Sequence, residues 1–517
     1  MFCSPKLSLT DLLGAEYVAH VAKAGAALGL LPKEEALAAA DEKVDFYPDA
    51  MQQKNDELLV SVGKELTHPF QEENQGAPTD AFRKAAHSFA APLTGACGYR
   101  LGENGRLYLL GKSEHYQASL GHRFPGYKLI DNARKMGILN ATHNNTRGFV
   151  TRLLERRLIA AANGISGEDG AALETVLQSA EPHVLNRVIN LETGSLACEA
   201  AIKMMLARFY HLEPTSAEPK YAGKTPVFFV MQDQNGGSEA NYHGTCITAQ
   251  TFRGLWPELV EKLETAGIYK VVPVAVNDLK DFRVKLERYN TGSYKTAGFL
   301  HELILMNYGG VRLEPEYVRA AHALCRETDT PTMVDEIQTG MWYPGMFLFR
   351  LYGLQPDFVT VGKGFPGGEY PASKIITTAE MDTLSQFGAL VTNGQEELAS
   401  LAYLITMTFE EANQERLREL GERFEHALQQ IADDYSATVC RAEGLGLLGA
   451  LHFYDVETAA RFASLVNKEC IDTSAQLYKT NCPPAVLLKP PVIASEKMLD
   501  FLAERLRSAL DHLEHQN

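Results

Sequence analysis

The most informative stretches of this chain are Thr332-Met-Val-Asp-Glu-Ile-Gln-Thr-Gly340 and Phe358-Val-Thr-Val-Gly-Lys-Gly364. In each of them an apolar run leads to a polar residue, which is Asp335 in the first and Lys363 in the second. Continuous apolar runs are typical of strands that are buried on both faces of a parallel sheet. Because ligands bind at the edge where parallel strands end, Asp335 and Lys363 are candidates for one shared crevice.

The surroundings of Lys363 disfavour one common interpretation and suggest another. Gly362 begins a G-x-G-x-x-G pattern, but a dinucleotide site needs a helix directly after it, and the strand-like run Lys374-Ile-Ile-Thr-Thr follows instead. A lysine held in a partly dry place has a lowered pKa and can act as an amine nucleophile. Taken alone, however, Lys363 is more typical of a surface turn, and Asp335 of a helix cap or turn.

A predicted helix start at Thr193-Gly194-Ser195 is the third candidate feature. The alanines and methionine that follow, from Ala197 to Met204, have helical spacing. Free backbone N–H groups and small hydroxyls at a helix start can hold a phosphate. In isolation, an ordinary N-cap is equally consistent with this stretch.

Composition narrows the class of protein. The 517 residues include 49 Lys and Arg against 65 Asp and Glu, a formal charge of −16, which disfavours nucleic acid or an anionic membrane as a partner. Eight scattered cysteines without a Cys-x-x-Cys pair, and histidines without ligand spacing, predict neither a disulfide framework nor a metal site. With no secretion signal and no apolar run of about 18 residues, we expect a cytoplasmic protein without a transmembrane helix.

The order of the segments predicts an α/β protein with a mostly parallel central sheet, helices on both faces, and a smaller α+β domain made from both chain ends. Expected landmarks are a hairpin at Glu103-Asn104-Gly105, a long helix from Leu398 to Tyr435 and a final helix from Ser495 to His512. The expected regions are a helical N-terminal extension (1–90), the N-terminal part of the small domain with the lead-in to the core (91–184), the large domain (185–395) and the C-terminal small domain (396–517).

Together, the three candidate features fit a phosphorylated cofactor that carries an aldehyde. Pyridoxal phosphate needs a lysine for a Schiff base, an acid at its pyridine nitrogen and an anion site for its phosphate. In this combination the chain resembles the class III pyridoxal-phosphate aminotransferases, from about Leu93 to the C-terminus. The resemblance implies the fold-type-I architecture, with the cofactor held by residues 185–395, and an obligate homodimer with shared active sites.

The resemblance also implies a role for each matching residue. Lys363 would form the Schiff base and carry the proton between substrate and cofactor, and Asp335 would keep the pyridine nitrogen protonated. The other matches are Thr193, Gly194 and Ser195 at the phosphate, Tyr242 on the ring face, Gln338 near the phenolic oxygen, Glu199 near the cofactor and Thr392, which would reach the phosphate of the neighbouring subunit.

Departures from the family pattern concern substrate selection. Family members usually carry Glu-Pro at the end of the strand before the aspartate strand, whereas this chain has Leu305-Met-Asn-Tyr there. Without an acid at that point, Arg441 is a candidate to bind a substrate carboxylate, although Glu443 can replace the missing partner and a structural arginine is equally consistent. Trp342 and Tyr343 are expected to enlarge the apolar lining near the substrate entrance.

The predicted activity is transfer of an amino group from an amine or amino acid to a keto acid or aldehyde, by a ping-pong mechanism through Lys363. The same site also supports an aminomutase or racemase. A non-catalytic scaffold or regulatory protein that retains the fold is an alternative of another class. Release of a free keto product would separate a transaminase from an isomerase, and failure to retain pyridoxal phosphate would favour the scaffold.

Overall fold

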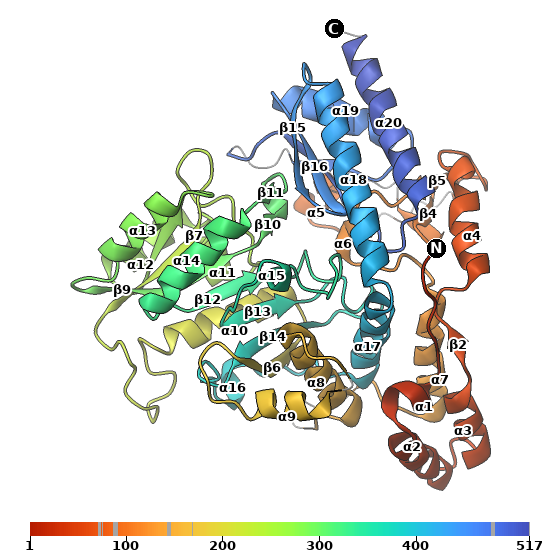
Figure 1. The fold of residues 1–517 in the computed structure, drawn as a ribbon, viewed down its shortest axis with the longest axis horizontal. Helices are drawn as coiled ribbons and strands as arrows, with labels where there is room; N and C mark the ends of the chain where they lie inside the picture. The colour runs from red at the N-terminus through yellow and green to blue at the C-terminus, as the bar shows by residue number, and fades with distance from the viewer. Residues whose placement is uncertain are drawn as a thin grey trace.

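The computed structural model describes residues 1–70, 74, 76–85, 91–141, 146–167, 169–476 and 481–515. Its centre is a seven-stranded sheet (Figure 1). The strand order is β6 (Leu185–Leu191), β14 (Ser373–Thr378), β13 (Phe358–Val361), β12 (Thr332–Asp335), β9 (Tyr294–His301), β7 (Thr225–Met231) and β8 (Lys270–Val274). β14 runs antiparallel to both of its neighbours, and every other neighbouring pair is parallel. The expectation of a mostly parallel central sheet is therefore confirmed.

Both faces of this sheet are covered, as the residues of β7 illustrate. Val227 and Phe229 pack into one hydrophobic cluster, whereas Phe228 and Val230 pack into another. Because successive side chains of a strand point to opposite faces, the sheet has a core on each side. The helices of this region are α8 (Phe149–Asn163), α9 (Gly170–Leu177), α10 (Gly194–Leu206), α11 (Ile247–Thr251), α12 (Pro257–Thr265), α13 (Leu279–Arg288), α14 (Pro315–Glu327), α15 (Leu348–Leu351) and α16 (Gln386–Ala389).

The C-terminal part contains a second, antiparallel sheet in the order β15-β16-β18-β17. Two helices contact this sheet, and the last helix of the chain packs against both of them. Ser495 caps that last helix by accepting a hydrogen bond from the Met498 N–H, so the predicted final helix is confirmed. The elements are β15 (Val439–Leu445), β16 (Leu448–Phe453), β17 (Ser474–Ala475), β18 (Ala485–Leu488), α18 (Gln414–Asp434), α19 (Val456–Lys468) and α20 (Glu496–Glu514).

The long helix expected from Leu398 to Tyr435 is instead two helices, α17 (Glu397–Glu411) and α18, which are separated at Asn413. The buried Asn413 amide donates to the carbonyl of Cys3 and accepts from the Cys3 N–H. A side chain that bonds to other backbone groups in this way competes with helix continuation. The break therefore holds the N-terminal segment against the body of the protein.

A short three-stranded sheet precedes the large one, formed by β3 (Pro92–Ala96), β4 (Tyr99–Gly102) and β5 (Leu107–Leu109). β4 and β5 pair antiparallel across the turn at 103–106, which confirms the predicted hairpin. A parallel bridge joins Leu109 to Ile471, so segments far apart in the sequence lie side by side. Between this sheet and α8 come α6 (Ser113–Tyr116), the 3-10 turn η3 (Pro125–Tyr127) and α7 (Lys128–Met136).

The N-terminal segment is helical, and Gly14 divides its first helical stretch. Gly14 has a φ of 85°, which only glycine adopts readily, and it separates α1 from α2. Phe2 anchors the segment by packing 5.8 Å from the ring of Phe409 in α17. The elements are β1 (Lys6–Leu7), α1 (Leu9–Leu13), α2 (Ala15–Ala27), α3 (Lys33–Asp41), β2 (Val44–Asp45), α4 (Asp49–Glu57), η1 (Leu58–Ser61) and α5 (Asp80–Ala85).

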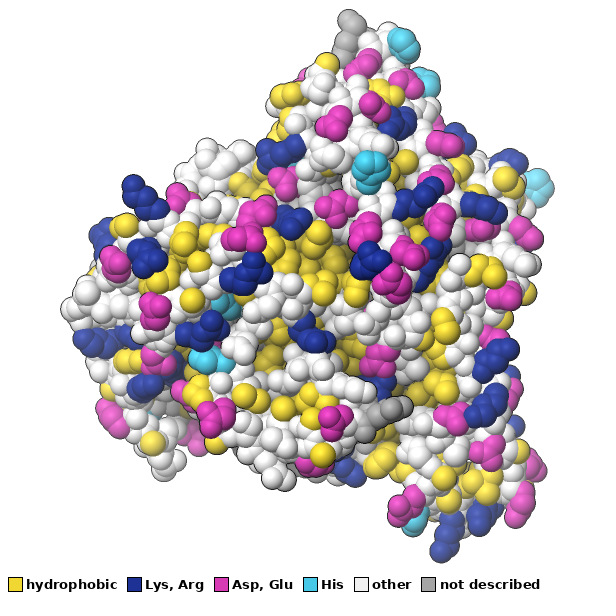
Figure 2. All heavy atoms as spheres, in the orientation of Figure 1, with side chains coloured by type: hydrophobic (Ala, Val, Ile, Leu, Met, Phe, Trp, Pro, Cys, Tyr) yellow, Lys and Arg dark blue, Asp and Glu magenta, His cyan; other side chains and the backbone are white. Residues whose placement is uncertain are grey.

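On the face drawn in Figure 2, acidic and basic side chains are interspersed, and hydrophobic side chains gather near its centre. In the described part of the chain, no helix combines the length and the apolar character needed to cross a membrane.

Candidate active site

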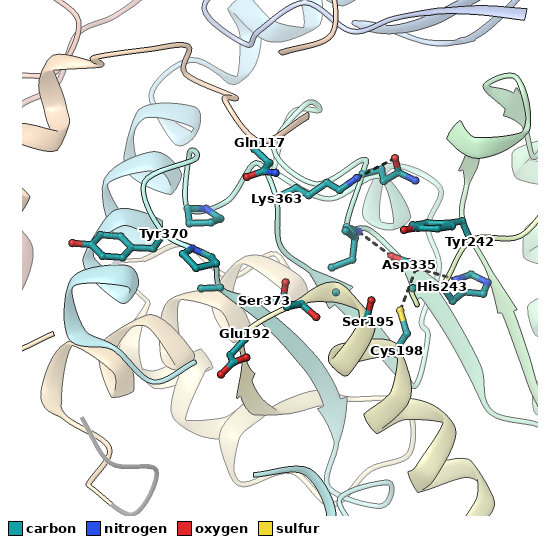
Figure 3. Close-up of a pocket in the computed structure, with 18 residues that line it drawn as sticks. Gln117, Glu192, Ser195, Cys198, Tyr242, His243, Asp335, Lys363, Tyr370 and Ser373 are labelled. Carbon is teal, nitrogen blue, oxygen red and sulfur yellow. Dashed lines mark hydrogen bonds and ion pairs between the residues drawn. The ribbon is translucent and has the colours of Figure 1, made fainter. Parts of the chain in front are cut away.

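A cavity of about 250 Å³ lies where two central strands end and helix α10 begins (Figure 3). Asp335 is the last residue of β12, and Lys363 follows β13 by two residues. The predicted alignment of strand ends along one edge thus brings both side chains to one crevice. Lining residues include Thr193, Ser195, Tyr242, Asp335, Gln338 and Lys363.

Asp335 is buried and surrounded by hydrogen-bond donors. Its Oδ1 accepts from the Ile337 N–H at 3.1 Å and from the Thr360 hydroxyl at 2.9 Å. Its Oδ2 accepts from His243 Nδ1 at 2.9 Å and from the Cys198 thiol at 3.3 Å. Burial acts to raise the pKa of Asp335, but the hydrogen bond and charge of His243, with the other donors, hold it below its ordinary value. The carboxylate is therefore kept ionised inside the cavity.

Lys363 combines an unusual backbone conformation with a lowered pKa. Its φ of 44° lies in the left-handed region, which costs a residue with a side chain roughly 1–3 kcal/mol and is common at functional sites. Burial lowers the pKa of its amine, against the opposing charges of Glu302 and Asp335. A lysine amine that loses its proton more easily is a better nucleophile.

Gln338 connects Lys363 to a buried acid that the sequence analysis did not identify. The Lys363 amine donates to Gln338 Oε1 at 3.4 Å, and Gln338 Nε2 donates to Glu302 Oε1 at 2.8 Å. The interpretation that no acid ends this strand is wrong, because β9 ends at His301 and Glu302 follows it directly. After Glu302 the apolar run continues through the short strand β10 (Ile304–Leu305) to the start of the turn η4 (Met306–Tyr308). The short strand β11 (Val311–Arg312) then pairs antiparallel with β10.

The start of α10 forms the opposite wall of the cavity. Thr193 is its N-cap, with the Thr193 hydroxyl accepting from the Leu196 N–H, and the predicted helix start is confirmed. The first N–H groups of a helix have no intrahelical acceptor and favour an anion. Gly244 has a φ of 107°, and a Cβ there would lie 2.5 Å from Ser195 Cα. The Thr245 N–H donates to the Ser195 hydroxyl at 3.0 Å, which holds the two segments together.

A second cavity, of about 370 Å³, shares Tyr242, Gln338 and Lys363 with the first. Tyr242 is half-buried, and the guanidinium of Arg253 lies 5.1 Å from the centroid of its ring. These shared residues therefore separate two compartments, one at the start of α10 and the other beyond Tyr242.

Five residues named from the sequence do not line either cavity. Arg441 has a side chain that is 51% exposed, pairs with Glu443 at 2.8 Å and borders a different hollow, beside Tyr308. Strand β15 therefore places Arg441 outside the two cavities that Lys363 lines, and its expected contact with a substrate carboxylate stays a prediction. Glu199 is half-buried in α10 and accepts from the Thr248 hydroxyl. Thr392 is exposed.

Trp342 and Tyr343 are buried core residues and do not widen the cavity entrance. The Trp342 indole donates to the Pro490 carbonyl at 3.0 Å, and the Tyr343 hydroxyl donates to the Leu445 carbonyl at 2.9 Å. A Cβ on Gly364 would lie 2.3 Å from the Trp342 ring, so the indole packs directly against the Lys363 turn. Their contribution is to dock the C-terminal segments onto that turn.

Several side chains around the cavity were not predicted from the sequence. The hydrogen bond of His243 to Asp335 helps to keep that carboxylate ionised. Lys489 is fully buried and donates to the Gln338 carbonyl, while burial and the charge of Lys363 lower its pKa well below the ordinary value. The Cys198 sulfur, a ring nitrogen of His243 and a carboxylate oxygen of Asp335 lie within 4.8 Å of one another. The hydrogen bonds of Cys198 and His243 to Asp335 explain this proximity. Only Glu302 carried a sequence signal, as a lone acid inside an apolar run.

This donor set matches the requirements of pyridoxal phosphate. A buried ionised carboxylate suits a protonated pyridine nitrogen, an amine with a lowered pKa suits an aldehyde, and the start of α10 suits a phosphate. The tight approach of Gly244 to Ser195 forms a cradle that a side chain would fill. Fold and site together define a pyridoxal-phosphate site of the fold-type-I class.

Comparison with known proteins agrees with this class. The family model for class-III aminotransferases matches residues 125–510. A putrescine aminotransferase from Pectobacterium atrosepticum is 30% identical over 251 residues, which cover 47% of this chain and 52% of that protein, so the match spans about half of the relative's length. The chain belongs to the class-III aminotransferase family, whose cofactor is pyridoxal 5′-phosphate.

Solved structures with low sequence identity share the fold. The aminotransferase from Vibrio fluvialis aligns with a TM-score of 0.67 at 19% identity, covering 86% of this chain and 97% of that one. The ornithine aminotransferase from Toxoplasma gondii aligns with a TM-score of 0.64 at 19% identity, covering 86% and 100%. At this level of identity, the alignments concern architecture.

Proposed function

We propose that this chain is a pyridoxal-phosphate transaminase that moves an amino group from an amine or amino acid to a keto acid or aldehyde in two half-reactions. The observation that carries the proposal is the joint position of Lys363 and Asp335 on one cavity that also reaches the start of α10. Pyridoxal phosphate, when bound, supplies an aldehyde for the amine and a ring that withdraws electrons from the substrate carbon.

The residues of this chain bind the cofactor and move the proton. Lys363 would hold the aldehyde end of the cofactor, and its amine would carry a proton between the substrate carbon and the cofactor carbon that bore the aldehyde. Asp335, fixed by its four donors, holds a proton at the pyridine nitrogen. The N–H groups of Gly194 and Ser195 bind the phosphate. Tyr242 covers the ring face, and Gln338 orients the Lys363 amine through its 3.4 Å contact.

We also propose a homodimer with shared active sites. Thr392, which the family resemblance assigns to the phosphate, is exposed and does not line the cavity of its own protomer. A contact between this hydroxyl and the phosphate therefore requires a second copy of the chain, as in an isologous dimer.

The test is the visible spectrum of the cofactor-loaded protein, titrated with amines and amino acids without any acceptor. The proposal predicts a cofactor band that particular amines bleach and that a keto acid then restores. A band that stays unchanged with every amine would contradict the proposal.

Two lysine variants separate the chemistry from folding. Lys363→Ala should remove all amine-driven bleaching and leave the thermal unfolding midpoint nearly unchanged. The matched control is Lys295→Met. Lys295 is also a buried lysine, and burial lowers its pKa to about 8, but it lies outside both cavities. The Lys295→Met variant should retain amine-driven bleaching. Loss of bleaching in both variants would point to misfolding.

A further inference from the structure

The second cavity, beyond Tyr242, has a lining of one charge type. Lys112 and Arg253 contribute cations, and the shared Lys363 lies at its inner end. Asn307, Ser474 and Gln476 add neutral polar groups, and none of the described lining residues is acidic. A compartment with cations and neutral donors attracts an anion and repels a second ammonium group.

Arg253 is the cation best prepared for a ligand. It follows α11 in a loop, and its guanidinium lies over the Tyr242 ring, a contact that restrains the side chain without neutralising its charge. Within the described part of the chain, no acidic side chain forms an ion pair with Arg253. An arginine held by an aromatic face presents a donor pair that matches a carboxylate or a phosphate.

Lys112 lies on the other wall and is almost fully buried, with 3% of its surface exposed. Its amine donates to the Ser474 hydroxyl and lies 3.1 Å from His115 Nε2. Burial lowers its pKa to about 8, with Asp472 opposing the shift and Lys363 adding to it. An anion in the cavity would stabilise the charged form of this amine and gain attraction in return.

Building on the proposed function, we infer that the compartment between Arg253 and Lys112 binds an anionic group, a carboxylate or a phosphate, on the amine substrate. The reacting amine would then point to Lys363, and the anion to Arg253. A diamine, whose distal ammonium would face two cations, is a poor substrate. Arg441, which the sequence suggested for this contact, lies outside this compartment.

The experiment measures bleaching of the cofactor band in the loaded enzyme with matched amines. The panel is 4-aminobutanoate, 3-aminopropanoate and O-phosphoethanolamine as anionic amines, butan-1-amine and propan-1-amine as neutral ones, and 1,4-diaminobutane as the dication. A second readout needs no turnover: calorimetric binding of butanoate, which has no amine, to the same enzyme. The variants are Arg253→Gln and a matched exposed arginine, Arg283→Gln.

At least one anionic amine should bleach the band with a kcat/KM at least about tenfold above that of the neutral amine and the diamine. Arg253→Gln should lower this value about tenfold, mainly through KM, and weaken butanoate binding similarly, while the neutral amines and Arg283→Gln stay unchanged. Preference for the phosphorylated amine would identify phosphate as the anion, and preference for an amino acid would identify carboxylate.

Two outcomes overturn the inference. One is a diamine that reacts as well as the anionic amines, and the other is an Arg253→Gln variant that slows all amines equally or leaves butanoate binding intact. Failure of the proposed function looks different. In that case no amine bleaches the band, while butanoate still binds and the binding still depends on Arg253.

Discussion

The four donors around Asp335 make its charge the most strongly determined feature of the cavity. Replacing it in Asp335→Asn keeps the size of the side chain and removes the negative charge beside the ring nitrogen. We expect the rate of amine-driven bleaching to fall roughly 100-fold or more, as when a preorganised electrostatic group is lost. Stopped-flow absorbance measures this rate.

The control for that prediction is Thr360→Val, which removes one of the four donors and leaves the charge. A hydrogen bond to a charged group is worth about 1.5–3 kcal/mol, but Thr360→Val leaves the carboxylate and its other three donors in place, so the rate should fall clearly less than in Asp335→Asn. Equal losses in the two variants would show that geometry, and not charge, is the function of Asp335.

Lys489 gives a prediction about stability and pH. Burial lowers the pKa of Lys489 in the folded protein. At any pH between this lowered pKa and the ordinary value of about 10.4, the unfolded chain holds a proton that the folded chain does not, so the stability of the wild type rises with pH over that range. Lys489→Met removes that cost. We expect the thermal midpoint of Lys489→Met to exceed that of the wild type at pH 7, by a margin that shrinks by pH 10.

The prediction is contradicted if the difference in thermal midpoint between Lys489→Met and the wild type stays constant or grows as the pH rises. That result would mean that Lys489 stays charged in the folded protein. Lys374→Met is a suitable comparison, because Lys374 is also buried with a pKa lowered to about 8 but lies on β14 and donates to the Gly394 carbonyl. Its margin should shrink over the same pH range.

Sequence reasoning found Asp335 and Lys363 because both end apolar strands, and strand ends converge in a parallel sheet. It missed the partners that set their chemistry. Glu302 was hidden because the apolar residues on both sides looked like one strand. Lys112 and Lys489 come from distant segments that meet only in the folded chain, and no local pattern marks a lysine that tertiary packing will bury.

Among the secondary-structure elements, the start of α10 depends on its contact with the loop at Gly244. Gly244→Ala adds a Cβ 2.5 Å from Ser195 Cα at a φ of 107°, so either the loop or the helix start must move. Strain of about 1–3 kcal/mol is expected there. We predict that pyridoxal phosphate binds about tenfold more weakly or worse, as equilibrium titration of the apoenzyme would measure.

The matched control is Gly236→Ala. Gly236 also has a positive φ, 85°, but a Cβ there meets no atom within 4 Å. This variant carries the backbone cost without the clash, and its cofactor affinity should equal that of the wild type. Equal weakening in both variants would show that backbone strain alone, and not the contact with Ser195, controls the site.

The elements themselves were predictable where hydrophobic periodicity was continuous, as in β7, β12, β13 and α20. The breaks were not. Asn413 interrupts a good helical pattern only because its amide bonds to Cys3, which lies at the other end of the chain. Arg441 was expected at the substrate because its motif matches the family, whereas the register of β15 turns it toward Glu443 and solvent.

For the assembled protein, shared active sites make a quantitative prediction. Thr392→Asp places a negative charge at the neighbouring phosphate, and Lys363→Ala removes the amine, so each variant alone should have little activity. In a mixed dimer one site carries both changes and the other carries none. Co-expression of the two variants should therefore restore about a quarter of the wild-type activity.

A mixture no more active than the sum of its two components would contradict sharing between subunits. Light scattering on the same samples separates the possible reasons. A dimer without restored activity would mean that Thr392 does not reach the other site, and a monomer would mean that the proposed assembly is wrong.

The most direct measurement is to find which lysine holds the cofactor. Three lysines, Lys112, Lys363 and Lys489, approach the same region, and burial lowers the pKa of each. Borohydride reduction of the cofactor-loaded protein fixes the cofactor to its amine, and peptide mass spectrometry locates it. We predict the added mass on Lys363 alone. An adduct on Lys112 or Lys489, or no adduct on any of the three, would contradict it.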